Sequence, residues 1–226
     1  MVILAVETSL APASVCLWGA GTLVGRTSGP GREFSSWLAP AVGELLEAAR
    51  EGGLAMEAVA VALGPGSFTG LRMGLATAKG LCLALGVPLA GVPTPYLVAL
   101  EVPVSERPLV VGIAASPREL YVTDYARGGD AWQRRGETRL LPVSQFIGGI
   151  LPPCLLAGPW RAEHAARVRE AHGGSVELLE VRPTAAALAR LAAEKLARGE
   201  TLPPESATPQ YVLDPTPVRR ARGEDV

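Results

Sequence analysis

The residues whose types and spacing come closest to ligand-binding chemistry lie in the glycine-rich stretch Ala62–Gly86. A short apolar run leads into this stretch, so the pattern predicts a buried strand, a tight turn and then a helix. The hydroxyl of Ser67 or Thr69 would cap that helix, and the N-terminus of a helix binds anions readily. The turn therefore raises the hypothesis of a phosphate cradle.

The turn departs from both strong phosphate-binding motifs. A Walker-type loop ends in Gly-Lys-Ser/Thr, whereas Gly70 is followed here by Leu71 and Arg72. A dinucleotide fingerprint has the spacing G-x-G-x-x-G, whereas Gly64, Gly66 and Gly70 are spaced G-x-G-x-x-x-G. The phosphate cradle is therefore the weaker interpretation of this stretch.

A second polar group follows the first apolar run, Val2–Val6, and consists of Glu7, Thr8 and Ser9. At the carboxyl end of a strand, such residues contact phosphate or metal-bound water in many α/β proteins. Ordinary turn chemistry explains the same residues, and the local pattern favours it. Glu7, Thr8 and Ser9 remain the candidate nucleotide-binding residues.

No residue is predicted to be catalytic or to bind a metal. His164 and His172 are the only histidines, and their separation does not match a metal-binding pair one helical turn apart. Ser67 stands in Gly-Ser-Phe rather than in the G-x-S-x-G of a nucleophile elbow. The sequence therefore favours packing and recognition over reactive chemistry.

The predicted helix after the turn is apolar or small almost all round. Leu71, Leu75 and Cys82 belong to one apolar stripe, while Gly70 and Gly74 lie on another face. A glycine inside a helix costs roughly 1 kcal/mol relative to alanine, so repeated glycines indicate that something packs close to the backbone. Two interpretations stay open: a central core helix, or a helix whose second face is covered by another chain.

Composition excludes several classes of protein. The 226 residues suffice for one large domain or two lobes, and the formal net charge of −1 gives no general attraction for nucleic acid. Cys16, Cys82 and Cys154 are scattered, as expected for free thiols in a reducing compartment. No signal peptide or membrane-spanning run is predicted, so we expect a cytoplasmic protein. Asparagine is absent and arginine far outnumbers lysine, which suits a thermophile or GC-rich coding.

The pattern predicts two α/β lobes, residues 1–104 and 105–226, with the boundary in the proline-containing stretch Glu101–Pro108. The chain end carries Arg219, Arg220 and Arg222, which would be a solvated terminus or, less favoured, an RNA contact. The expected strands are Val2–Val6, Ser14–Trp18, Thr22–Thr27, Ala58–Leu63, Val87–Val92, Leu109–Ala114, Glu119–Tyr125, Trp132–Leu140 and Cys154–Ala157. The expected helices are Phe34–Arg50, Phe68–Leu85, Thr94–Leu100, Val143–Ile150, Arg161–Ala171 and Thr184–Arg198.

Three motifs together resemble one family. They are Ile3–Ser9 (ILAVETS) with Ser14–Trp18, Gly64–Gly80 (GPGSFTGLRMGLATAKG) and Gly86–Thr94 (GVPLAGVPT). They are similar to the TsaB (YeaZ) family of bacterial tRNA threonylcarbamoyladenosine biosynthesis proteins, formerly filed as glycoprotease-like or M22 peptidase homologues. The likeness is clear over the first 125 residues and fainter beyond them.

The resemblance implies the actin-like ATPase superfamily fold, with two lobes that each hold a mixed β-meander sheet flanked by helices. It also implies a non-catalytic subunit that forms homodimers and pairs with a larger TsaD-type subunit. That subunit carries the metal and transfers the threonylcarbamoyl group to the adenosine beside the tRNA anticodon, and a TsaE-type ATPase joins them. No tightly bound cofactor is implied for this chain; ATP or ADP would act in the complex, and tRNA would be contacted indirectly.

The family's dimerisation surface corresponds to the helices expected at Phe34–Arg50 and Phe68–Leu85. We interpret Gly70 and Gly74 as positions where a partner helix comes close. The candidate interface residues are Phe34, Trp37, Leu38, Ala41, Leu45, Gly70, Leu71, Met73, Gly74, Thr77 and Leu81.

Three positions depart from the family pattern. Glu7 replaces the common aspartate, Phe34 replaces a frequent histidine, and Ile113–Ser116 replaces the sequence I-D-A-R. Each change removes or lengthens a polar group that would contact nucleotide or metal. The rival hypotheses are an independent nucleotide-binding ATPase or M22-type peptidase, and direct capture of tRNA by the arginine-rich chain end.

Overall fold

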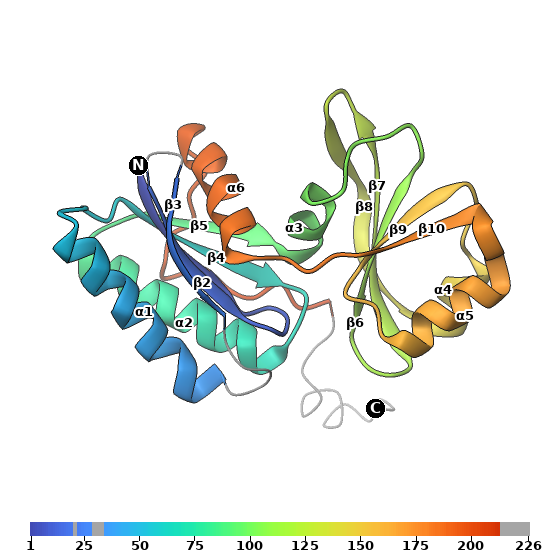
Figure 1. The fold of residues 1–226 in the computed structure, drawn as a ribbon, viewed down its shortest axis with the longest axis horizontal. Coiled ribbons are helices and arrows are strands. Elements are labelled where there is room, and N and C mark those ends of the chain that lie inside the picture. Colours follow the sequence, from blue (N-terminus) through green and yellow to red (C-terminus); the bar gives the residue numbers. More distant parts are fainter. Residues whose placement is uncertain (20–21, 29–33, 213–226) are drawn as a thin grey trace. The chain divides into compact units, whose positions relative to one another are not determined.

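The protein is described by a computed structural model that covers residues 1–19, 22–28 and 34–212 (Figure 1). The chain folds into two compact units. The first unit contains Met1–Leu97 and Pro183–Pro209, and Val98–Arg182 forms the body of the second. Throughout the described ranges, every helix is too short or too polar to span a bilayer.

The first unit is built on a five-stranded mixed sheet. Its strand order is β3-β2-β1-β4-β5, in which β1 to β3 form an antiparallel meander and β4 and β5 run parallel to β1. β1 and β4 are buried along their whole length, which explains their uninterrupted apolar sequences. The strands are β1 (Val2–Glu7), β2 (Ser14–Gly19), β3 (Thr22–Ser28), β4 (Ala58–Gly64) and β5 (Leu89–Pro93).

Helices cover both faces of this sheet, as Figure 1 shows. α1 (Phe34–Glu51) and α2 (Phe68–Leu85) pack on one face, where Val2, Leu4 and Val6 of β1 join the core beneath α1. α6 (Ala185–Ala197) lies on the opposite face and contacts β1 and β2. The short helix α3 (Thr94–Leu100) follows β5 directly.

The structure divides the chain differently from the expected boundary at residue 104. We expected α6 in the C-terminal lobe, but the chain returns and places this helix on the first unit's sheet. The backbone N–H of Ala185 donates a hydrogen bond of 2.8 Å to Ser14 Oγ, and Leu188 and Ala192 are fully buried. The physical reason is that the second face of the apolar sheet needs a cover, which no helix of the N-terminal segment supplies.

The second unit repeats the arrangement of the first. Its strand order is β10-β9-β6-β7-β8, with an antiparallel meander from β6 to β8 and with β9 and β10 parallel to β6. The prediction of two α/β lobes with mixed meander sheets is therefore confirmed. The elements are β6 (Leu109–Ala114), β7 (Glu119–Gly128), β8 (Ala131–Pro142), α4 (Val143–Gly148), β9 (Cys154–Gly158), α5 (Ala162–His172), a 3₁₀ turn (Gly173–Ser175) and β10 (Val176–Glu180).

Candidate functional site

The end of β1 and the glycine-rich turn after β4 lie against each other. β1 and β4 are neighbouring parallel strands, so their carboxyl ends meet at one edge of the sheet. Thr8 Oγ1 donates a hydrogen bond of 2.8 Å to the carbonyl of Gly70, and Ser67 N–H donates one of 2.7 Å to the carbonyl of Ser9. The two polar motifs identified in the sequence therefore form one structure.

Glu7 is the titratable group of this structure, and its side chain is fully buried. Its Oε1 accepts hydrogen bonds from Ser9 N–H at 2.8 Å and from Ser9 Oγ at 2.5 Å, while Oε2 has no hydrogen-bond partner among the described residues. Burial raises the pKa of Glu7 from 4.5 to about 7, and the hydrogen bonds from Ser9 oppose the rise. The carboxyl group thus changes charge close to neutral pH inside the protein.

The candidate nucleotide-binding residues are closed off in this conformation. Glu7, Thr8 and Ser9 are each fully buried, and their side-chain hydrogen bonds run to one another or to the glycine turn. A nucleotide-binding role for them stays a prediction. Their observed contacts instead hold the turn that leads into α2.

The start of α2 uses its amide groups internally. Ser67 caps the helix, as predicted, and its Oγ accepts a hydrogen bond of 3.2 Å from Gly70 N–H. The amide of Leu71 donates to the Ser67 carbonyl at 2.8 Å. With Ser67 N–H bound to Ser9, three amides that a phosphate cradle would offer already have partners.

Two glycines of α2, Gly70 and Gly74, face their own chain. A Cβ atom on Gly70 would lie 2.0 Å from the Thr8 carbonyl oxygen, and one on Gly74 would lie 2.1 Å from Thr8 Oγ1. Something does pack close to the helix backbone, as predicted, but our identification of it as a partner helix was wrong. By contrast, a Cβ atom on Gly80 would meet nothing within 4 Å.

The candidate interface residues divide into two groups. Leu38, Ala41, Leu45, Gly70, Leu71 and Gly74 are buried within the first unit. The partly exposed members are Trp37, Met73, Thr77 and Leu81. Phe34 begins α1, and its side chain lies outside the described residues, as do Arg219, Arg220 and Arg222 of the chain end.

The exposed side of α2 carries residues that the sequence interpretation did not select. We call this stripe the α2 face, and its members recur every three to four residues: Phe68, Thr69, Arg72, Ala76, Gly80 and Leu83. Phe68 is 41% exposed and Leu83 is 64% exposed, which is unusual for such large apolar side chains. The helical spacing of these residues, opposite the Leu71–Leu75–Cys82 stripe, is the signal that would have identified them.

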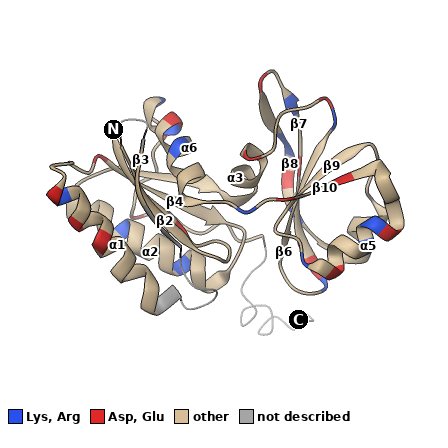
Figure 2. Cartoon of the chain, in the orientation of Figure 1, with Lys and Arg blue, Asp and Glu red and all other residues tan. Residues whose placement is uncertain are grey.

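Charge on α2 is sparse and of one sign (Figure 2). The guanidinium carbon of Arg72 lies 3.8 Å from the centroid of the Phe68 ring, an arrangement that stabilises an exposed aromatic side chain. Lys79 is bound within the protein, because its Nζ donates hydrogen bonds to the carbonyls of Glu205 and Ala207 at 3.1 and 3.2 Å. Arg72 is therefore the charged member of the α2 face.

Both histidines bind backbone carbonyls in the second unit. His164 Nε2 lies 3.0 Å from the Pro117 oxygen, and His172 Nε2 lies 2.9 Å from the Ile147 oxygen. Within residues 1–19, 22–28 and 34–212, no three side chains of His, Cys, Asp or Glu gather in a way that would hold a metal ion. The histidines thus have structural contacts.

Comparison with known proteins gives consistent matches. The family model described as "TsaD: tRNA N6-adenosine threonylcarbamoyltransferase" matches residues 29–165. The Escherichia coli protein named tRNA threonylcarbamoyladenosine biosynthesis protein TsaB is 26% identical over 233 residues, which covers 100% of both chains.

Two solved structures from Pseudomonas aeruginosa are similar along nearly the whole chain. YeaZ is 26% identical, with a TM-score of 0.73 over 93% of this chain and 99% of that one. A protein described as similar to the peptidase YeaZ is also 26% identical, with a TM-score of 0.76 over 94% and 99% of the two chains. The likeness therefore extends over both units.

Proposed function

Because the chain belongs to the TsaD family of tRNA N6-adenosine threonylcarbamoyltransferases and, within it, to the TsaB (YeaZ) proteins, we propose that it takes part in threonylcarbamoyladenosine biosynthesis on tRNA. Its two units have the actin-like ATPase fold. In the proposed role it is a non-catalytic subunit that binds and activates a TsaD-type transferase, which modifies the adenosine beside the anticodon. A TsaE-type ATPase would join this pair, and tRNA would be bound by the complex.

The α2 face is the observation that carries this proposal. Phe68 and Leu83 supply exposed apolar surface, while Ala76 and Gly80 leave room for the backbone of another helix to approach. The rigid position of α2 supports docking, since Ser67, Gly70 and Thr8 tie its first turn to the end of β1. A preformed apolar stripe loses little conformational entropy when a partner covers it.

α1 would contribute to the same interface. Trp37 of α1 and Met73 and Leu81 of α2 pack against the core cluster beneath α1 and are partly exposed. Both helices therefore contribute to the exposed surface there. We therefore revise the proposed interface to the α2 face together with Trp37, Met73, Thr77 and Leu81. The same surface would serve the homodimer when the TsaD-type subunit is lacking.

Reconstitution of the transferase reaction tests the proposal. Threonylcarbamoylation of tRNA by the TsaD-type subunit of the same organism should depend on this protein. Gly80→Leu should lower that activation about tenfold or more, because a leucine side chain would fill the space that the partner helix needs. The variant itself should fold normally, since leucine is a better helix former than glycine.

Gly148→Leu is the matched control, because a Cβ atom at the end of α4 in the second unit also meets nothing within 4 Å. It should leave activation unchanged. Full transferase turnover without this protein would refute the activator role. Full activation by Gly80→Leu would instead refute the α2 face as the interface while leaving the role intact.

The rival activities are tested on the isolated protein. Calorimetric titration with ATP and magnesium should give no binding in the micromolar range, because Glu7, Thr8 and Ser9 are buried against the glycine turn. Micromolar binding would favour an ATPase acting alone, and cleavage of an unfolded substrate protein would favour the peptidase.

A further inference from the structure

β10 is the outer strand of the second unit's sheet and pairs, among the described strands, only with β9. Val181 N–H, just beyond β10, donates a hydrogen bond of 3.1 Å to the carbonyl of Gly158 at the end of β9. In a parallel pair, residues two apart direct their backbone groups to the same side. Leu178 and Glu180 therefore direct their N–H and C=O groups away from β9, along the free edge.

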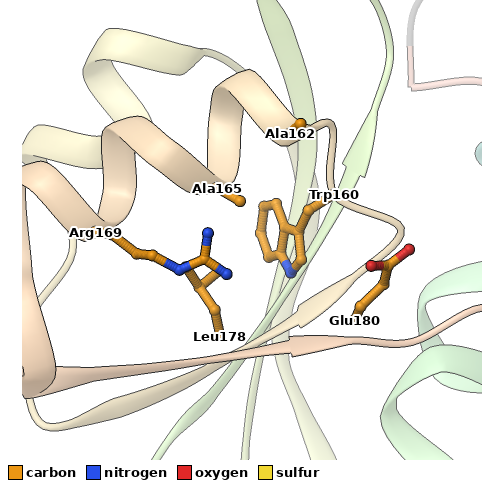
Figure 3. A pocket seen from close by; sticks show the side chains of 6 residues that line it. All are labelled: Trp160, Ala162, Ala165, Arg169, Leu178 and Glu180. Carbon is orange, nitrogen blue, oxygen red and sulfur yellow. The ribbon is translucent and has the colours of Figure 1, made fainter.

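A hollow of about 410 Å³ borders this edge (Figure 3). Its wall comes from the start of α5, from the segment after β9 and from β10 itself. The lining residues are Trp160, Ala162, Ala165, Arg169, Leu178 and Glu180. Leu178 and Glu180 thus offer both backbone groups to the edge and side chains to the hollow.

The apolar wall of the hollow is fixed in place. Trp160 Nε1 donates a hydrogen bond of 3.1 Å to the Leu179 carbonyl, and its ring stacks on Phe146 with the centroids 6.0 Å apart. The indole also covers Gly112, where a Cβ atom would lie only 2.4 Å from the ring. Trp160 and the half-buried Leu178 therefore present a rigid surface for an apolar side chain.

The two charged residues of the hollow, Glu180 and Arg169, differ in whether their side chains have a partner. Glu180 Oε1 already accepts a hydrogen bond of 2.9 Å from Arg182. The guanidinium of Arg169 makes no hydrogen bond or ion pair with any residue in the described part of the chain, and Figure 3 shows it extending into the hollow. The hollow therefore has an unpaired positive group suited to a carboxylate.

We propose that β10 binds an extended acidic peptide segment of a partner protein as an additional strand of the sheet. The peptide backbone pairs with Leu178 and Glu180, an apolar side chain rests on Trp160 and Leu178, and an acidic side chain binds Arg169. Strand addition of this kind obtains its affinity from main-chain hydrogen bonds and its specificity from alternate side chains. This site lies in the other unit from the α2 face and is independent of the proposed function.

The outer strands of the two sheets differ in how well they are protected. Leu202 N–H donates a hydrogen bond of 2.9 Å to the Leu89 carbonyl and so covers part of the β5 edge. The β8 edge carries exposed Arg134, Arg135 and Glu137, and charged side chains are a common protection against strand addition. β10 carries exposed Glu177 and Glu180, but both carboxylates are already paired, with Arg107 and Arg182, and Leu178 and Leu179 lie between them.

A peptide titration followed by NMR tests the proposal. The probe is acetyl-TDTLTD-amide, in which aspartate and leucine share one face, and the ¹⁵N-labelled protein is the full chain. We expect the amide signals of Leu178 and Glu180 and the indole N–H of Trp160 to shift together. Arg169→Gln should weaken binding about tenfold, because it removes a charge-assisted hydrogen bond. Arg167→Gln is the matched control on the same helix and should have no effect.

Three results would overturn the proposal. One is the absence of shifts along β10 at millimolar peptide. Another is equal binding of acetyl-TKTLTK-amide, which would show that Arg169 does not select an acidic partner. The third is tighter binding of a uridine hexanucleotide at the same amides, which would assign the hollow to RNA, with Trp160 stacking on a base.

Discussion

The two units share one strand order, but the outer strands of their sheets are protected differently. In the first unit, a segment after α6 covers β5 through Leu202, and Lys79 holds the same segment by the carbonyls of Glu205 and Ala207. In the second unit, β10 pairs only with β9 within the part of the chain that the structure describes, and a hollow borders its outer edge. The comparison teaches that the first unit protects the β5 edge of its sheet and exposes a helix face, whereas the second unit leaves the β10 edge unpaired among the described residues.

Glycines mark close approaches in both units, but different groups approach them. Gly70 and Gly74 make room for Thr8 at the end of β1, whereas Gly112 makes room for the indole of Trp160. Glycine spacing therefore reveals that a close contact exists and does not identify the group that makes it.

The largest predicted effect concerns the contact between the end of β1 and the start of α2 in the first unit. Gly70→Ala should lower the free energy of unfolding by at least ~3 kcal/mol, because the added Cβ would overlap the backbone carbonyl of Thr8. Gly80→Ala should be neutral or stabilise the protein by up to about 1 kcal/mol. Urea unfolding followed by circular dichroism measures both. Equal stability of the two variants would show that β1 and α2 are not in the contact described.

The next effect is pH-dependent and also belongs to the first unit. Glu7 has a folded-state pKa of about 7 against an unfolded value of 4.5, so the folded protein binds more protons than the unfolded chain between these values. Its contribution to stability is present below pH 4.5 and is lost as pH rises through 7, by about 3 kcal/mol in total.

Glu7→Gln should remove this dependence, which is measured as the difference in unfolding free energy between pH 5 and pH 8. The wild-type protein should lose more stability than the variant over that interval. Parallel pH profiles for the two proteins would mean that the Glu7 carboxyl is not buried as described.

The smallest effect would make the two sheet edges more alike. Lys79→Met keeps an apolar stem but removes the hydrogen bonds to Glu205 and Ala207, and should cost about 1 kcal/mol. Hydrogen exchange at Leu202 and along β5 should become faster. Lys195→Met is the control, because its partner Glu200 is an exposed carboxylate. If exchange at Leu202 is unaltered, Lys79 does not hold the segment.

Much of the fold could be predicted from apolar periodicity. β1, β4 and α3 are found where they were expected, because each is a short apolar run bounded by turn residues or a helix cap. β10 was missed, since Glu177 and Glu180 interrupt its apolar pattern. α6 was recognised as a helix, but the sheet that it covers depends on a return of the chain that no local pattern encodes.

The candidate site was predicted only in part, because local sequence also does not show which face of a helix packs on the sheet. α2 is apolar or small on nearly every side, so periodicity could not distinguish the face buried in the core from the face left exposed. Leu71 and Gly74 were assigned to a partner although they pack within the first unit, whereas Phe68 and Leu83 were overlooked. The exposed residues of α2 could be distinguished from its buried residues only when the position of α2 on the sheet was known.

The return of the chain at Pro183 makes Val98–Arg182 an insertion within the first unit. During synthesis, the first unit's sheet therefore emerges from the ribosome with one face bare and stays so until Ala197 has been added. Val98–Arg182, by contrast, is complete by then and free to fold. The sheet that begins the chain is thus covered on its second face only after Val98–Arg182 has been made, and a product that stops before α6 would display its apolar strands to the chaperones and proteases of the cell.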